Sequence, residues 1–565
     1  MSRTEGSREE ARSAAQYYRG HRIPERVEEA LNTGYRLQPP DLLGYLSNYF
    51  AELSMPPVIS GVRGRKVLGG AGSAALEVEV FCTVRNKEKR ICSTVISADP
   101  ATPLTCHEAE EKERAMSVET AIGWIRETIG PLLGGTQPTE QSDIDQILSD
   151  FFQPKLEEER RRRDNERDAA ALSTRSAPTP PISPAAGKKK GSGKAGKKAA
   201  AAEKSIPPAD PPEPVIRGSL AVSAVSLAVA TSAAILRDVP LYSYVSAMKH
   251  GKPPSEVTMP TPLITMMSCG KASPGKLNLM KEIMVVPRPG LTAQQAVDLA
   301  SSLQAEIINQ MDGVCKGGAW CTSVAMPGCL VFGAERMDQP LDLMRGACER
   351  LGLQLGGDVY VAINCAAYEL MDENKGKYEI IGGVWKSPEE MVDLYVDLLG
   401  RHPAIVALVD PLRKEDAAQW EALGKAVSSR CYLIADVASK TAPGPQRGDP
   451  VLSSGAVLKY TNHMTISDLL EAVQLMEGQN RVTVLGCPQE ESSGSSVVDL
   501  AVALGSRFVM LGGLLRGERT AKYNRLVAIE EELGQIGMLG LHTTFDFPML
   551  WPSEEICNTE TKPSL

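Results

Sequence analysis

Apolar positions near the start of the chain repeat with helical spacing. Pro24 is expected to begin a first helix, whose interior reads ERVEEAL, and Gly34 to end it. A second helix is predicted to begin within QPPDLLGYLSNYFAEL, where one wide apolar stripe comprises Leu42, Leu43, Leu46, Tyr49, Phe50 and Leu53. A hairpin this small cannot bury such a stripe by itself. It is therefore expected either to dock on its own protein or to pair with a second copy.

Between residues 57 and 217 the spacing of apolar residues first predicts strands, then helices, and then is lost. ALEVEVFCTV and KRICSTVIS, within residues 57–100, predict strands, and residues 117–151 predict helices. Residues 157–217 contain EEERRRRDNERD, KKKGSGKAGKK and PPADPPEP. Too few apolar side chains are present there to offset chain entropy, so this basic, proline-rich insert is predicted to be disordered. Its basic run is typical of a solvated linker, and contact with an acidic partner is the alternative.

From residue 259 onward, strand-like runs alternate with amphipathic helices, as in VYVAIN followed by SPEEMVDLYVDLLG. This alternation predicts parallel βα units in an α/β fold. Roughly 300 residues of this pattern suit a closed (β/α)8 barrel, with its working face at the strand ends. An open doubly wound sheet is the alternative, but it lacks the expected glycine-rich dinucleotide fingerprint.

Composition and charge narrow the functional classes. The chain has 565 residues, of which 42% are hydrophobic and 23% charged, and its net charge of −9 argues against a dedicated nucleic-acid binder. Its 12 cysteines form no CxxC pairs, which favours free thiols over zinc ribbons or a disulfide framework. The polar first residues predict no signal peptide. Residues 218–236 carry no charge, yet their many alanines and serines favour a buried helix over a membrane span.

The predicted strand ends supply the candidate chemistry. Only Glu282, Asp436 and Lys459 are obvious chemical groups there. Asp410 directly follows Val409, and because neighbouring strand residues face opposite ways, it is not expected to replace an inward carboxylate. The remaining strand-end residues are Asn364, Gly486 with Cys487, and Met510.

These segments resemble the enolase family. ERTAKYNRLVAIEEELG is the most specific piece, and SLAVATSAAILRDVPLYSYV, KEIMVVP, VDPL and IAD support it in order. GVRGRKVLGGAGSAALEVEV resembles the opening hairpin of the family's N-terminal domain. The closest fit is the divergent vertebrate enolase 4 type, which implies cytoplasmic localisation and the sperm flagellum. The resemblance places an α+β N-terminal domain at 56–156 and 218–250, with a C-terminal barrel at 251–565.

The resemblance implies dehydration of 2-phosphoglycerate to phosphoenolpyruvate in glycolysis, with magnesium as cofactor. In that chemistry a lysine removes a proton beside a carboxylate, and two metal ions neutralise the enolate. Lys459 falls at the family's base, Glu282 at its substrate-side glutamate, and Asp436 at one metal carboxylate. A buried structural pair of Lys459 with Asp436 is the alternative for those two residues.

Other family positions are degenerate. The metal aspartate falls on Asn364, whose carbonyl is at best a weak ligand, and the metal glutamate falls on Val409, which cannot ligate. The acid–base glutamate falls on Pro327, and the loop histidine falls near Ser273, with Lys271 as a possible substitute. His463 is expected to be a loop histidine, with a new proton carrier as the alternative. The phosphate cradle and second lysine fall on Gly486, Cys487, Pro488 and Met510.

Residues 23–53 also resemble the docking-and-dimerisation domain of cAMP-dependent kinase regulatory subunits, through the QPPDL step and the following YF pair. This implies that residues 1–55 form a homodimer whose groove accepts an amphipathic helix of an anchoring protein. Three functions remain open. They are a scaffold with weak or lost catalysis, an active magnesium-dependent enolase tethered to a cellular structure, and an enzyme of the same superfamily acting on another carboxylate.

Overall fold

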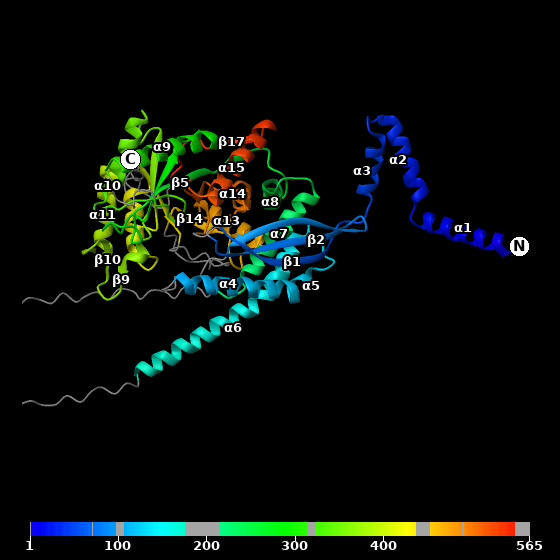
Figure 1. The fold of residues 1–565 in the computed structure, drawn as a ribbon, viewed down its shortest axis with the longest axis horizontal. Helices are drawn as coiled ribbons and strands as arrows, with labels where there is room; N and C mark the ends of the chain where they lie inside the picture. Colours follow the sequence, from blue (N-terminus) through cyan, green and yellow to red (C-terminus); the bar gives the residue numbers. More distant parts are fainter. Residues whose placement is uncertain are drawn as a thin grey trace, which may run out of the picture.

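The computed structural model describes residues 2–70, 72–97, 107–175, 215–314, 323–436, 453–488 and 491–548. Three parts follow one another along the chain, and Figure 1 shows the N-terminal helices lying apart from the other two. These helices are α1 (Ser2–Gly20), α2 (Ile23–Leu37) and α3 (Leu42–Glu52). Most of the predicted insert, residues 176–214, lies outside the described residues, as do residues 549–565.

The N-terminal hairpin has the two predicted helices, but Gly34 does not end the first. Gly34 is buried inside α2, where an added Cβ would lie 3.0 Å from Leu42 Cδ1 and 3.4 Å from the Tyr45 ring. The glycine therefore permits close approach of α3, and α2 ends at Leu37 before left-handed Gln38. Asp41 caps α3 by accepting a hydrogen bond from the Gly44 N–H at 2.8 Å. Helix α1 has no counterpart among the elements expected from the sequence.

The second part is a three-stranded antiparallel sheet covered by helices. Its strands, in the order β1-β2-β3, are β1 (Val58–Leu68), β2 (Ala74–Val84) and β3 (Lys87–Ser97). The helices are α4 (His107–Trp124), the π-helical η1 (Ile125–Ile129), α5 (Gly130–Leu133), α6 (Gln141–Arg175), α7 (Leu220–Leu236) and α8 (Leu241–His250). Disorder beginning at residue 157 is a wrong expectation, because α6 continues to Arg175. Ion pairs one helical turn apart, such as Arg162 with Glu166 at 2.7 Å, support its outer turns.

Helix α7 is the uncharged stretch, and it is buried as expected. It contacts strands β2 and β3, and helices α6 and α13 (Ile466–Gly478). Among the described residues, no single helix is long and apolar enough to cross a membrane. Helices α7 and α8 meet the length and composition criteria only together, and the pair is bent by 101°.

The third part is a closed eight-stranded barrel, in the order β16-β15-β14-β13-β12-β8-β6-β5 with β16 also pairing β5. Its strands are β5 (Thr261–Ser268), β6 (Glu282–Pro287), β8 (Val359–Asn364), β12 (Ile405–Val409), β13 (Tyr432–Ala435), β14 (Gly455–Lys459), β15 (Val482–Gly486) and β16 (Phe508–Gly512). The predicted closed barrel is confirmed, but β6 departs from the parallel βα units and runs antiparallel to both neighbours. No helix separates β5 from β6, so the chain cannot make the crossover that parallel pairing needs.

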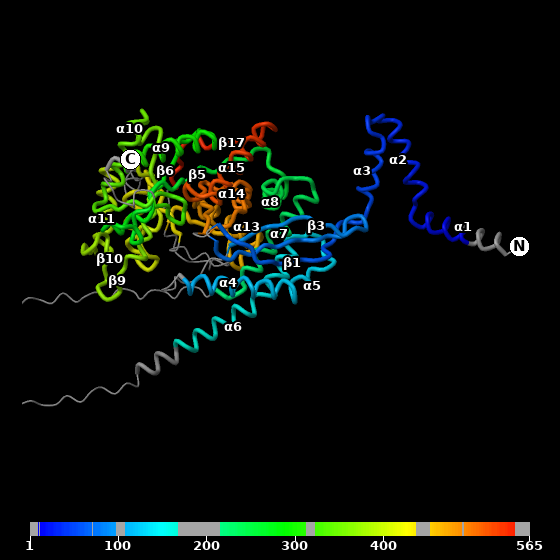
Figure 2. The backbone as a smooth tube through the Cα atoms, viewed as in Figure 1, coloured from blue at the N-terminus to red at the C-terminus, as the bar shows by residue number. Residues whose placement is uncertain are grey.

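Helices surround the barrel, and Figure 2 follows the same path as a tube. They are α9 (Ala293–Val314), α10 (Asp338–Arg350), α11 (Pro388–Arg401), α12 (Ala417–Val427), α13 (Ile466–Gly478), α14 (Ser496–Leu504) and α15 (Gly517–Gln535). Short elements complete the fold: β4 (Val257–Met259), β7 (Leu330–Val331), η2 (Ala367–Leu370), β9 (Met371–Asp372), β10 (Lys377–Ile381), β11 (Val384–Lys386) and β17 (Leu539–Leu541). The barrel interior holds its own apolar cluster, which includes Val409, Val457 and Phe508.

Candidate functional site

A cavity of about 90 Å³ opens at the end of the barrel where the parallel strands finish. Most of the predicted site residues line it, although Ser273 and Val409 do not. Glu282 reaches this end although it is the first residue of β6, because β6 runs in the opposite direction. The lining residues are Thr265, Lys281, Glu282, Pro327, Asn364, Ala366, Tyr368, Asp410, Asp436, Val457, Lys459, Gly486, Cys487, Pro488, Met510, Gly512 and Arg519.

Lys459 and Asp436 form an ion pair inside this cavity. The Lys459 Nζ lies 2.8 Å from Asp436 Oδ1 and 2.8 Å from Oδ2, so the ammonium bridges both carboxylate oxygens. Lys459 is the last residue of β14, and Asp436 directly follows the adjacent β13. The side chains are only 28% and 17% exposed. Asp436 is therefore neutralised by the group that the family resemblance assigns as the base.

Asn364 is occupied by contacts within the protein. Its Nδ2 donates to Glu282 Oε2 at 2.9 Å, across the antiparallel pairing of β6 with β8. Its Oδ1 accepts the Ala366 N–H at 3.2 Å. The Asn364 carbonyl oxygen that could ligate a metal thus already accepts a hydrogen bond, and the side-chain amide N–H donates one to the Glu282 carboxylate.

Asp410 lies in the cavity, so the expectation from strand alternation is wrong for this residue. Strand β12 ends at Val409, and Asp410 has a left-handed φ of 45°, which redirects its side chain. Its Oδ1 accepts the Asp436 N–H at 2.8 Å. Val409 is fully buried in the barrel's apolar cluster. The carboxylate therefore buttresses Asp436, while the valine contributes only packing.

A second set of charged groups carries no signal in the sequence pattern. Lys281 Nζ pairs with Glu369 Oε1 at 2.6 Å, and the Tyr368 hydroxyl lies 3.1 Å from the same carboxylate oxygen. Burial, followed by the nearby carboxylates of Glu369 and Asp410, raises the pKa of Tyr368 well above its usual value. Lys281 is adjacent to Glu282 in sequence, but nothing in the sequence pattern indicates that Tyr368 reaches the cavity.

The wall expected to hold phosphate is apolar. Gly486, Cys487, Pro488 and Met510 all line the cavity, and burial raises the pKa of the Cys487 thiol. Arg519 also lines the cavity, and its Nη2 donates to the Pro488 carbonyl at 3.0 Å. Most side chains on this wall thus offer no charge to a phosphate, and Arg519 already holds the backbone.

Three further candidates lie outside the cavity lining. Ser273 Oγ donates to the Ser268 carbonyl at 2.9 Å, and Lys271 Nζ donates to the Glu369 carbonyl at 2.6 Å. His463 lies in a turn after β14 and stacks on the Phe152 ring with 4.8 Å between centroids. These contacts give the three residues roles in packing the loops around the barrel.

The cavity does not fit the magnesium ions that the family chemistry uses. Among the described residues, no group of three or more His, Cys, Asp or Glu side chains is arranged to hold a metal ion. Asp436 already faces the Lys459 ammonium, and Asn364 is committed to Glu282. Magnesium requires several oxygen ligands in octahedral geometry, and the carboxylates of Glu282, Asp410 and Asp436 that line the cavity each already accept a bond from a protein group.

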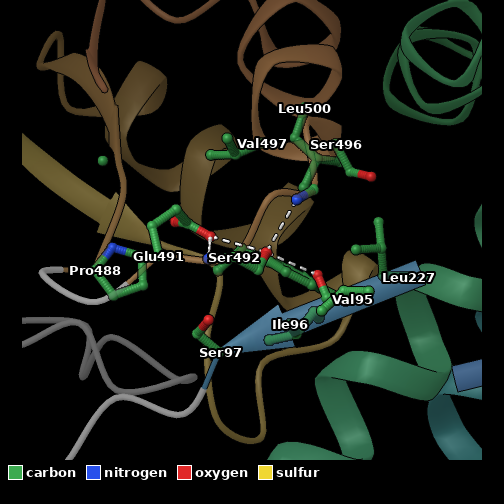
Figure 3. Close-up of a pocket in the computed structure, with 13 residues that line it drawn as sticks. Val95, Ile96, Ser97, Leu227, Pro488, Glu491, Ser492, Ser496, Val497 and Leu500 are labelled. Atoms are coloured by element: carbon green, nitrogen blue, oxygen red, sulfur yellow. Dashed lines mark hydrogen bonds between the residues drawn. The ribbon is translucent and has the colours of Figure 1, made fainter. Parts of the chain in front are cut away.

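A second, smaller pocket lies at the junction between the two folded domains and shares lining residues with this cavity (Figure 3). Ser492 Oγ donates to the Val95 carbonyl in β3 at 3.1 Å, and its N–H donates to Glu491 Oε1 at 2.8 Å. The buried Lys522 Nζ donates to the Ser492 carbonyl at 2.7 Å. Gly486 and Pro488 line both this junction and the cavity, so the contact between Ser492 and β3 lies beside the cavity wall.

Comparison with known proteins agrees with this architecture. The family model described as Enolase, C-terminal TIM barrel domain, matches residues 256–543. The chain is 54% identical over 551 residues to Enolase 4 of Xenopus laevis, covering 97% of this chain and 96% of that protein. It is 44% identical over 567 residues to Enolase 4 of Homo sapiens, covering 94% and 90% respectively. The barrel and the extended alignments together show that this chain belongs to the enolase family.

Proposed function

We propose that this enolase-family chain has weak or lost catalysis and acts as a structural scaffold. The observation that carries the proposal is that the residues at the family's metal-ligand positions are either apolar or already bonded to other protein groups. Val409 is a core residue, Asn364 is bound to Glu282, and Asp436 is paired with Lys459. Without a divalent ion, the only cations that the structure describes in this lining are Lys281, Lys459 and Arg519, each already bonded within the protein, and they do not replace the two metal ions that balance the dianionic enolate of the family reaction.

The magnitude of the expected loss is large. Removing one preorganised charge partner from a catalytic site typically costs about 10²–10³ in rate. Here two metal ligands, the acid–base glutamate and the phosphate contacts are replaced together, and groups that act as a unit fail as a unit. We therefore expect turnover near the uncatalysed background.

A coupled assay for phosphoenolpyruvate on the pure full chain, with and without magnesium, tests the proposal. We expect no magnesium-dependent rate and the same background for wild type and Lys459→Ala. The melting temperature should also be unchanged by millimolar magnesium, since a ligand that binds the native state would raise it. Turnover at ordinary enolase rates that disappears in Lys459→Ala would overturn the proposal.

The scaffold role includes assembly through the N-terminal hairpin. Its apolar face is open in the single chain, with Tyr35 78%, Leu37 63% and Leu43 79% exposed. An exposed apolar surface of this kind is typical of a protein-binding face. We propose that two hairpins pair as a homodimer and that the paired face accepts an amphipathic anchoring helix, for example in the sperm flagellum.

Point variants of the full chain test the hairpin. Leu43→Ser should weaken self-association at the hairpin and capture of an amphipathic helix, because it places a polar group on that face. Glu28→Gln, an exposed change on α2 outside the apolar stripe, is the matched control. Unchanged helix capture in Leu43→Ser would contradict the assignment. Because the enolase body can also dimerise, helix capture is more informative than oligomeric state alone.

A second candidate function is an active, tethered magnesium-dependent enolase. The observation that favours it is that Lys459, Glu282 and Asp436 line one cavity, joined by the carboxylate of Asp410. This candidate predicts a magnesium-dependent rate that Lys459→Ala abolishes, so the same coupled assay separates the two functions.

A further inference from the structure

A larger cavity opens at the other end of the barrel, between helices α10 and α11. Its volume is about 680 Å³, within the range of small-molecule sites. It lies where β8 and β12 begin, whereas Asn364 and Asp410 of the candidate active site lie where these strands finish. We refer to this cavity as the α10–α11 pocket.

The walls of the α10–α11 pocket are largely apolar. Leu341 on α10 and Ile405 at the start of β12 form its deep part, and each is only 2% exposed. Leu353 and Leu355, in the segment between α10 and β8, form a partly exposed side. Such walls favour an alkyl or aromatic group, because burying apolar surface contributes about 25 cal/mol per Å².

The rim of the pocket carries a string of basic side chains. Arg345 Nη2 lies 3.4 Å from His402 Nδ1, and His402 Nε2 lies 3.0 Å from Asp338 Oδ1. Arg401 Nη1 pairs with the same Asp338 oxygen, while its Nε pairs with Asp397 at 2.9 Å. Among the described residues that line the pocket, Glu349 is the one acidic side chain.

This string already stabilises one carboxylate. The hydrogen bond from His402 and the contacts with Arg401 lower the pKa of Asp338. Nη2 of Arg401 makes no hydrogen bond to any residue that the structure describes. An incoming carboxylate at the rim would meet this open donor and the Arg345 guanidinium, which is 45% exposed and whose Nη1 also pairs with Asp342 Oδ1 at 3.2 Å. Charge-assisted bonds to a guanidinium are among the stronger hydrogen bonds in proteins.

We propose that the α10–α11 pocket binds a small organic acid with an apolar body and one carboxylate. The apolar body lies against Leu341, Leu353 and Ile405, and the carboxylate is held at Arg345 and Arg401. This site is separate from the candidate active site, so the proposal does not depend on whether the protein has enolase activity.

Calorimetric titration of the full chain with octanoate tests the proposal. We expect saturable binding of one octanoate per chain, with octanol and octylamine at least tenfold weaker, since neither offers an anion to the rim. The double variant Arg345→Gln/Arg401→Gln should weaken octanoate about tenfold. Arg350→Gln removes one positive charge from α10 outside the lining and should leave the affinity unchanged.

A second variant tests the apolar walls of the pocket, and a third tests whether octanoate binds instead to the N-terminal hairpin. Leu353→Trp should fill the pocket and abolish binding of octanoate, and circular dichroism reports whether each variant folds. Leu43→Ser alters the exposed hairpin face and should leave octanoate binding unchanged. Equal affinity for octanol, an equal loss in Arg350→Gln, or full binding in folded Leu353→Trp would overturn the proposal.

Discussion

Asp145 joins the two folded domains, and its removal should cost far more stability than removal of an exposed carboxylate from the same helix. The side chain is 2% exposed at the start of α6. Its Oδ1 accepts hydrogen bonds from Ser226 on α7 at 2.6 Å and from Gln141 at 2.9 Å. Its Oδ2 accepts both the N–H, at 3.0 Å, and the hydroxyl, at 2.7 Å, of Ser467 on α13.

The expected cost follows from the donors that Asp145→Ala would leave unsatisfied. The Ser467 N–H and the Ser226 hydroxyl are half-buried or buried, and each unsatisfied donor costs about 1–3 kcal/mol, whereas the Gln141 amide keeps its bonds to Ser226. Losing both, with partial relaxation, should lower the free energy of unfolding by about 3–4 kcal/mol. Asp145→Asn keeps one accepting oxygen and should cost less, about 1–2 kcal/mol.

Burial also gives this carboxylate a distinctive pH dependence. Desolvation raises the pKa of Asp145 above its usual value, although the hydrogen bonds oppose the shift. A raised pKa means that the folded state binds the proton more tightly than the unfolded state. The contribution of Asp145 is thus most favourable below its unfolded pKa, and it falls as pH rises through the folded value.

Urea unfolding of the two Asp145 variants between pH 4 and 8 tests these expectations. The matched control is Asp143→Ala, because Asp143 is exposed in the same helical turn and should change the unfolding free energy by less than about 0.5 kcal/mol. The reasoning fails if Asp145→Ala costs no more than the control. It also fails if Asp145→Asn retains the wild-type pH slope.

Three further predictions concern other parts of the chain. Burial, and after it the charge of Arg507, lowers the pKa of His542 to about 4, so the free energy of unfolding should fall as pH drops from about 6.5 to 4. In denaturant titrations, His542→Gln should remove about 1–2 kcal/mol of that loss, after allowance for solvent screening. An unchanged pH dependence of the free energy of unfolding in His542→Gln would contradict this. Val409→Glu places a carboxylate in the barrel core and should lower the free energy of unfolding by about 4 kcal/mol. Adding magnesium should not restore this stability. A magnesium-dependent rise in the melting temperature of the variant would show that the cavity can still bind metal. Gly34→Leu should push α2 and α3 apart and reduce hydrogen-exchange protection in the hairpin, while Gly20→Ala, which meets no neighbour, should not; equal protection in both would refute the close contact.

Much of the fold could be predicted because its signals are periodic. The apolar stripe of the hairpin, the uncharged α7 and the βα alternation each follow from spacing or composition. The reversed strand β6 could not be predicted that way, since a buried strand has the same composition in either direction. The continuation of α6 to Arg175 could not be predicted from the lack of apolar residues, because charged side chains that cannot form a core can still form ion pairs along a helix.

The candidate site could be predicted in part, and the errors have a local cause. Lys459, Asp436, Glu282 and Asn364 lie at barrel ends as their strand positions imply. The expectation for Asp410 is wrong because alternation holds only while the strand lasts, and a left-handed residue ends it. The choice of partners, such as Asn364 with Glu282, depends on register across strands distant in sequence.

The projecting end of α6 sets a limit on how the chain can be shortened. Leu156 is the last buried residue among the α6 side chains that the structure describes, and Arg175 ends the helix, which corresponds to about 28 Å at 1.5 Å per residue. The chain returns at Arg217, whose Nη2 lies 2.7 Å from Glu113 Oε2 on α4. A connection that returned along the full length of these outer turns would need about nine extended residues. Trimming both the connection and the outer turns of α6 together would remove that requirement, so a crystallisable short form should delete them as one unit.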